Sequence, residues 1–250
     1  MPLIVAAAGI SVGFGQSTQG WLLEKMPPAL ETEFALSSLP PRLRDAATVY
    51  LLDPTKGYYM ARKGTNGLTA FVMRTQWEKA EFLPDVYSPM SYDEAGAKTF
   101  VPLYFDVAAM RATGKYSPAQ IRDSIVKRVK DGRYKAPPRT GISYMLSPVS
   151  RARSSEGFVN SVMPHYMFYA PRVDNADIGG DWDGGHSPFT VSPSDNLLDK
   201  EHSIFNLIIL PAGDAEKAKI IAQNKDLLDK LVAYKACFKI ETTTALMHHH

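Results

Sequence analysis

Hydrophobic positions along the chain of 250 residues follow two spacings, one typical of strands and one typical of helices. The runs TVYLLD, GYYMARKG and LTAFVMR are rich in β-branched and aromatic residues, and the turn sequences PTK and TN separate them. This pattern predicts a three-stranded antiparallel meander, in which Asn66-Gly67 supplies the positive φ that a tight hairpin needs. Further strands are predicted at residues 141–146, 165–170 and 204–210, whereas residues 76–94 are predicted to be irregular.

Apolar residues at helical spacing predict a helix over residues 95–112, another from Asp214 onward, and one or two short helices within residues 20–47. Residues 117–120 (SPAQ) predict a further helix start, because serine caps free amides, proline suits the first turn and glutamine completes a capping box. Its buried stripe would be Ile121, Ile125 and Val129. Because the strands are not regularly interleaved with helices, the sequence predicts an α+β fold: a mainly antiparallel sheet of about six strands with helices packed on it.

Composition and the chain ends bear on domain count and compartment. A chain with 45% hydrophobic and 22% charged residues is ordinary for one globular domain, which we assign to residues 17–246. Residues 1–16 resemble the hydrophobic part of a secretory signal peptide and predict a soluble, exported protein, periplasmic or extracellular; the alternative is an N-terminal strand that packs in the fold. The apolar run is shorter than the roughly 20 residues of a membrane span. Residues 247–250 read as a tag remnant.

Charge is small in total and uneven along the chain. The net charge of +2 argues against a nucleic-acid binder. Residues 115–153 hold ten Lys or Arg against two acids, and residues 174–201 hold seven acids against one lysine. Two solvated faces that attract each other weakly would explain this pattern, and a basic patch for an anionic ligand is the alternative. The sequence has no P-loop, dinucleotide fingerprint, HExxH motif or cysteine pair for zinc.

Three histidines outside the tag, His165, His186 and His202, lie in or beside the acidic segment. His165 and His202 each stand near the start of a predicted strand, so a suitable pairing of these strands would bring their imidazoles together, with His186 supplied by the loop between them. Three imidazoles with Asp181 or Asp183 would suit zinc, copper or iron. The spacings of 21 and 16 residues match no known metal signature.

The loop DNADIGGDWDGG admits other interpretations. Carboxylates on a glycine-rich turn suit calcium, although Gly184 and Gly185 leave the fifth EF-hand position without an oxygen side chain. Trp182, between two aspartates, would otherwise be a lid residue over a pocket. His165 would otherwise be a hydrogen-bonded structural residue at a strand end.

Four short stretches resemble a family of exported bacterial proteins known mainly as hypothetical sequences: Arg62–Gly67 with the strand after it, Ile142–Leu146, Pro164–Pro171 and Ile208–Pro211. The resemblance spans roughly residues 40–212. It implies an exported compartment and no particular chemistry, because no activity is established for that family. Relatives often carry cysteines where this chain has Ala70 and near Met90, and any disulfide there is missing from this chain.

The sequence therefore leaves three functions open. The first is binding of a small molecule in a pocket edged by His165, Tyr144 and Trp182 of the 174–186 loop. The second is a metal-dependent hydrolase or oxidase that uses the three histidines, with one of the two loop aspartates as ligand or base and a divalent metal as cofactor. The third is a non-catalytic structural or interaction protein, in which the aromatic residues only form core and interface.

Overall fold

The computed structural model describes residues 21–155, 157–180, 187–192 and 197–240. The signal-like segment 1–16 and the tag residues 247–250 lie outside these ranges, so export stays a prediction. Within the described residues, no helix combines the length and the apolar character needed to cross a bilayer.

Eight of the strands within the described residues form one sheet, and two form a separate hairpin. The order in the sheet is β2-β1-β3-β4-β5-β8-β10-β9, and the hairpin pairs β6 with β7. The strands are β1 (Thr48–Asp53), β2 (Gly57–Arg62), β3 (Thr69–Met73), β4 (Ser88–Tyr92), β5 (Ile142–Met145), β6 (Ser150–Ser154), β7 (Gly157–Ser161), β8 (His165–Tyr169), β9 (Phe189–Val191) and β10 (Leu207–Pro211).

The helices precede the sheet, connect its strands and follow its last strand. They are α1 (Pro28–Ser37), α2 (Pro41–Arg44), α3 (Glu94–Ala112), α4 (Pro118–Lys130), α5 (Asn175–Ile178), α6 (Asp214–Gln223) and α7 (Lys225–Tyr234), with the 3₁₀ turns η1 (Trp77–Lys79) and η2 (Ala236–Phe238). Proline sets the start of α1, α2 and α4, because its missing N–H has no partner in the first turn and its fixed φ suits a helix.

The predicted α+β class is confirmed, but the details of the sheet are corrected. Over the described residues the sheet is mixed and has eight strands, with β1 and β3 paired in parallel, instead of being mainly antiparallel with about six. The two additional strands are β4 and β9. β4 falls in the segment predicted to be irregular, because Pro89 and two serines hide its strand character, and β9 is only three residues long.

The predicted three-stranded meander is wrong at its second connection. β2 pairs with β1 in an antiparallel ladder, but β3 joins the opposite edge of β1 and runs parallel to it. The connecting loop passes across the start of β1: the Thr65 N–H donates to the Ala46 carbonyl (2.7 Å) and the Gly64 N–H donates to Thr48 Oγ1 (2.9 Å). Gly67 has φ +76°, so the positive φ was predicted correctly in a turn of another kind.

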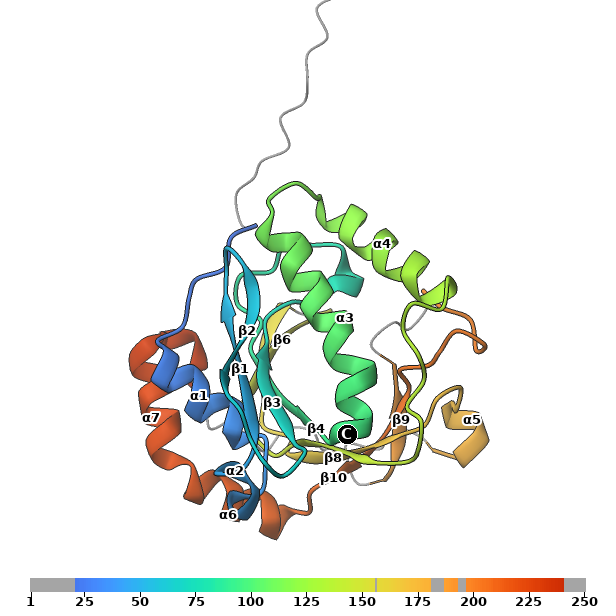
Figure 1. The fold of residues 1–250 in the computed structure, drawn as a ribbon. Helices are drawn as coiled ribbons and strands as arrows, with labels where there is room; N and C mark the ends of the chain where they lie inside the picture. Colours follow the sequence, from blue (N-terminus) through green and yellow to red (C-terminus); the bar gives the residue numbers. More distant parts are fainter. Residues whose placement is uncertain (1–20, 156, 181–186, 193–196, 241–250) are drawn as a thin grey trace, which may run out of the picture.

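Helices cover both faces of the sheet. The sheet curls around α3, while α1 lies against its outer face and α7 packs on α1 (Figure 1). Alternating residues of β3 supply both cores: Phe71 packs on the α3 side, 5.6 Å from the ring of Tyr104, whereas Ala70 and Val72 pack on the α1 side. Burial on both faces explains why this strand is a continuous apolar run.

Helix α4 begins as the sequence predicted. The Gln120 N–H donates to Ser117 Oγ (3.2 Å), and the Ser117 N–H donates to Gln120 Oε1 (2.8 Å), which completes a capping box. We expect Ser117→Ala to lower the free energy of unfolding by about 1 kcal/mol, because the Gln120 N–H at the helix start loses its side-chain acceptor. Urea unfolding measures this loss. The control Ser124→Ala, in the middle of the same helix, should change stability by less than half as much; equal effects would contradict the capping role.

Candidate functional site

His165 begins β8, as predicted, and its side chain is almost completely buried. Its Nδ1 lies 2.7 Å from the Met163 carbonyl oxygen. Burial lowers the pKa of the imidazole below its ordinary value, because a charged ring is poorly solvated there. The ring is therefore neutral near pH 7 and donates Nδ1–H to the carbonyl. This arrangement fits the structural alternative, a histidine hydrogen-bonded at a strand end.

His165 and Tyr144 lie on opposite faces of the sheet. The register of β5 and β8 places Tyr144 opposite Tyr166, and Met145 opposite His165. Side chains directly opposite one another share a face, and successive residues alternate. The rings of Tyr144 and Tyr166 accordingly meet edge to face, with centroids 5.9 Å apart. The prediction of one pocket edged by both His165 and Tyr144 is corrected, because alternation separates them.

His165 and His202 lie at opposite ends of the same pair of strands. β8 and β10 pair antiparallel, so His165 stands opposite Pro211, the last residue of β10. His202 precedes β10, and the neighbouring Ser203 carbonyl accepts the N–H of Arg172, beyond the far end of β8. Five-residue strands separate these ends by about 13 Å at 3.3 Å per residue. The predicted meeting of the two imidazoles is therefore wrong, because it required a parallel pairing.

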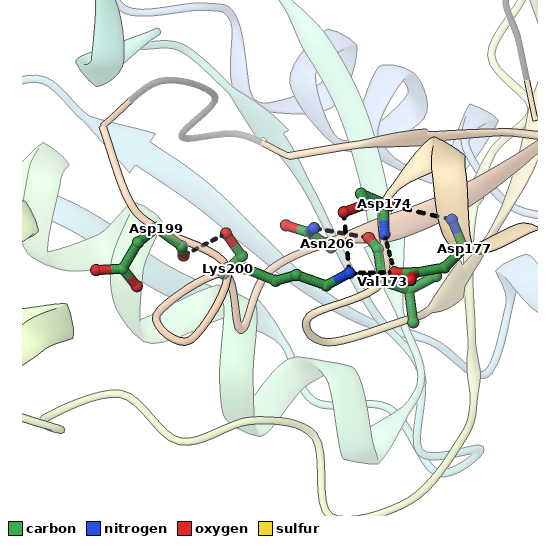
Figure 2. A network of polar contacts seen from close by, with 7 residues as sticks. Val173, Asp174, Asp177, Asp199, Lys200 and Asn206 are labelled. Carbon is green, nitrogen blue, oxygen red and sulfur yellow. Dashed lines mark hydrogen bonds and ion pairs between the residues drawn. The ribbon is translucent and has the colours of Figure 1, made fainter.

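Part of the acidic segment is held by its own lysine. The Nζ of Lys200 lies 2.7 and 2.9 Å from the two carboxylate oxygens of Asp177 and 3.0 Å from Oδ2 of Asp174 (Figure 2). Asp174 and Asp177 also form the capping box of α5. The ammonium lowers the pKa of Asp177, and the carboxylates raise the pKa of Lys200. Lys200 thus supplies the cation that these carboxylates bind.

His202 has a carboxylate partner of its own. Its Nδ1 and its backbone N–H lie 2.7 and 3.0 Å from Oδ1 of Asp199, and these hydrogen bonds lower the pKa of that carboxyl. In the part of the chain that the structure describes, no cluster of three or more His, Cys, Asp or Glu side chains could hold a metal ion. The other predicted site residues lie outside the described residues, and their roles stay predictions: Asp181, Trp182, Asp183 and His186.

The basic segment is partly neutralised by one acid from α3. Asp106 accepts hydrogen bonds from Arg128 (2.8 Å) and from the Tyr134 hydroxyl (2.8 Å), and Arg133 lies 3.3 Å from the same oxygen. These contacts attach α4 and the following loop to α3. They favour the interpretation of this segment as a charged face of the fold over that of a ligand-binding patch.

A cavity of about 560 Å³ opens between α2 and α6. One wall is the turn from α1 into α2, and the other is a single face of α6, whose contributing residues recur at helical spacing; these ribbons lie next to each other in Figure 1. Leu146, which follows β5, and Tyr166 of β8 line it as well. The lining is Leu39, Pro40, Pro41, Arg42, Arg44, Leu146, Tyr166, Ala215, Glu216, Lys219, Ile220, Gln223 and Asn224.

Tyr166 and Glu216 form a fixed polar contact at the start of α6. The tyrosine hydroxyl donates to Glu216 Oε1 at 2.5 Å. Partial burial and the neighbouring carboxylate raise the pKa of Tyr166 to about 12, so the phenol keeps its proton near neutral pH. The pair therefore gives this end of the cavity a hydrogen-bonded wall.

Arg44, the last residue of α2, lies beside the C-terminal end of the same face of α6. Its guanidinium donates to the carbonyl of Leu39 (Nε, 2.9 Å), to Oδ1 of Asn224 (Nη1, 3.2 Å) and to the carbonyl of Ser37 (Nη2, 3.4 Å). Burial lowers its pKa from the ordinary value, although the group remains charged. These bonds fix a partly buried cation between α2 and the end of α6.

Comparison with protein-family models, with curated proteins and with solved structures found no match to this chain. The resemblance to exported bacterial proteins therefore stays a prediction. The cavity and the side chains that line it are the features of the molecule that bear on function.

Sequence reasoning missed this cavity. Its two walls are more than 170 residues apart in the chain, and neither carries a motif. The signals available were the Pro40-Pro41 break and the predicted helix from Asp214. Neither indicated that the exposed residues Lys219 and Gln223 would line a cavity together with α2.

Proposed function

We propose that the protein binds a small, largely apolar molecule in the cavity between α2 and α6. The observation that carries this proposal is the cavity itself, whose volume lies within the range of about 300–1,000 Å³ typical of small-molecule sites. Five of its thirteen described lining residues are leucine, isoleucine or proline, and six carry charged or amide side chains. Such a combination gives affinity through apolar contact and orientation through hydrogen bonds.

Binding is supported better than catalysis by the chemistry of this lining. The Tyr166 hydroxyl, with its raised pKa and its bond to Glu216, acts as a hydrogen-bond donor at neutral pH. Arg44 is a permanent cation with three protein partners. A general acid or base works best with a pKa near the working pH, and neither group meets that requirement.

The test blocks the cavity with a bulky side chain. Ala215 lines it, and we expect Ala215→Trp to weaken binding of the neutral fluorescent probe N-phenyl-1-naphthylamine by at least tenfold, because the indole would occupy the ligand's space. Ala218 lies on the same helix, is exposed and does not line the cavity, so Ala218→Trp is the matched control and should bind within twofold of the unaltered protein. Fluorescence titration measures both affinities.

Two results would overturn the proposal. One is the absence of saturable probe binding to the unaltered protein. The other is an equal loss of affinity in the Ala215 and Ala218 variants, which would place the probe elsewhere. Circular dichroism melting curves establish that both variants are folded.

A further inference from the structure

Positive charge dominates the lining of the cavity. Among the described residues that line it, Arg42, Arg44 and Lys219 contribute three cations, and Glu216 contributes the one carboxylate. That carboxylate already accepts the hydroxyl hydrogen of Tyr166. Among the described residues, none of the three cations has a carboxylate partner within 4 Å. Glu33 attracts Arg44 at longer range, but its carboxylate is paired with Lys230 at 2.7 Å. The described side chains around the cavity therefore leave an excess of positive charge.

Arg44 makes this imbalance significant, because it is partly removed from water. Its guanidinium donates to two backbone carbonyls and to the amide oxygen of Asn224, which are neutral. A guanidinium has five N–H groups, so two remain for another partner. A desolvated cation gains most from a charged acceptor, and arginine binds carboxylates in a two-pronged geometry. Arg42 and Lys219 are exposed and lie on the two walls that flank it.

The rest of the lining sets the shape of a complementary molecule. Leu39, Leu146 and Ile220 provide apolar surface away from the cations. At roughly 30 Å³ per non-hydrogen atom, near the share of one water in the liquid, a ten-carbon carboxylate needs about 360 Å³. This lies below the cavity volume of about 560 Å³. A ligand with a second negative charge would be repelled by the carboxylate of Glu216, so the lining favours a single negative charge.

We infer that the ligand of this cavity is an amphipathic monoanion, with one carboxylate at Arg42, Arg44 and Lys219 and an apolar body against Leu39, Leu146 and Ile220. This inference rests on the proposed function, because it names the class of molecule that the cavity takes. The charge of the lining selects the headgroup, and the apolar walls select the body.

The first experiment compares headgroups on one apolar chain. Isothermal titration of the full-length protein with decanoate, decanol and decyltrimethylammonium should show decanoate binding at least tenfold more tightly than decanol, and the cation binding most weakly. Raising the salt concentration should weaken decanoate binding more than decanol binding, because charge attraction is screened. Decanol binding as tightly as decanoate, or tighter binding of the cation, would overturn the inference.

The second experiment removes the exposed cations and leaves Arg44, which has structural bonds, in place. The double variant Arg42→Met/Lys219→Met should lose at least fivefold in decanoate affinity and keep its affinity for the neutral naphthylamine probe. Lys217→Met, on the same helix but outside the lining, is the control and should keep both affinities. Unchanged decanoate binding in the double variant would contradict the inference.

The two proposals fail in distinguishable ways. Loss of all saturable binding, neutral and charged, contradicts the cavity as a binding site. Normal binding of the neutral probe without preference for decanoate leaves that proposal standing and removes only the assignment of the anion. Displacement of decanoate by dioleoylphosphatidylglycerol vesicles at equal or lower lipid concentration would assign the anion site to a membrane headgroup and overturn the free carboxylate.

Discussion

Replacing Gly64 with alanine is expected to destabilise the protein by at least about 3 kcal/mol, because there is no room for a methyl group at this position. A Cβ built on Gly64 would lie 2.3 Å from the carbonyl oxygen of Ala46 and from two backbone atoms of the next two residues. These are main-chain atoms at the start of β1, so they cannot move aside as a flexible side chain would. Relief requires the loop to leave β1, and with it the crossing that places β3 in parallel beside β1.

Gly213→Ala is the matched control. Gly213 has φ −65°, and a Cβ there would meet no atom within 4 Å. This variant should therefore unfold within about 0.5 kcal/mol of the unaltered protein. Chemical unfolding of both variants measures the difference. A Gly64 variant as stable as the Gly213 variant would mean that the loop does not pack across β1 as described.

Replacing Glu31 with glutamine is expected to remove a strong pH dependence of stability. Glu31 is 1% exposed, and its Oε1 accepts the N–H of Leu52 at 2.9 Å. Burial raises its pKa from 4.5 to about 7, and the Leu52 N–H, Arg74 and Lys25 offset only part of this effect. The folded state therefore binds a proton more tightly than the unfolded state. The resulting stability is fully present below pH 4.5 and is lost as the pH rises through about 7.

The size of this effect follows from the raised pKa. A difference of roughly 2.5 pH units corresponds to about 3 kcal/mol between the two limits. The stability of Glu31→Gln relative to the unaltered protein should therefore rise by about 3 kcal/mol between pH 4 and pH 8.5. The amide donor that glutamine adds changes the free energy of unfolding by an amount that does not depend on pH, so it leaves this rise unchanged. Urea unfolding across the pH range measures it, with Glu33→Gln on the surface of the same helix as control. If the stabilities of the Glu31 variant and the unaltered protein changed in parallel with pH, the raised pKa of the buried Glu31 carboxyl would be contradicted.

Elements with local causes were predictable from the sequence. Helix α4 begins with the capping box that residues 117–120 indicated, and Ile121, Ile125 and Val129 are buried as its stripe. Helix α3 occupies the range predicted from periodicity within one residue. In both cases the deciding contacts join residues at most four positions apart, and the sequence displays those spacings directly.

Features that depend on distant pairing were not predictable in the same way. A hairpin and a crossover after β2 contain the same turn residues, and the backbone bonds of residues 64–66 to Ala46 and Thr48 decide between them. The face on which His165 lies follows from alternation only after its register against Met145 is known. The start of β10 was predicted at residue 204, whereas the strand begins at Leu207, where its pairing with Tyr169 of β8 begins.

The candidate site shows the same limit. The sequence drew attention to histidines and acids within residues 163–202, because these residue types carry chemistry. The cavity instead brings a proline turn against a helix more than 170 residues later, and its residues are individually ordinary. Tyr166, next to the predicted His165, reaches the cavity because it points to the other face of the sheet.

The central claim is that the cavity between α2 and α6 holds the anionic ligand. A crystal structure of the protein with 10-bromodecanoate tests it most directly, because the anomalous signal of bromine locates the ligand without reference to protein density. The account predicts one bromine peak inside the cavity, in contact with Leu146 or Ile220, and a carboxylate at Arg44. A bromine peak beside His165 or the acidic segment, or no peak at saturating ligand, would contradict it.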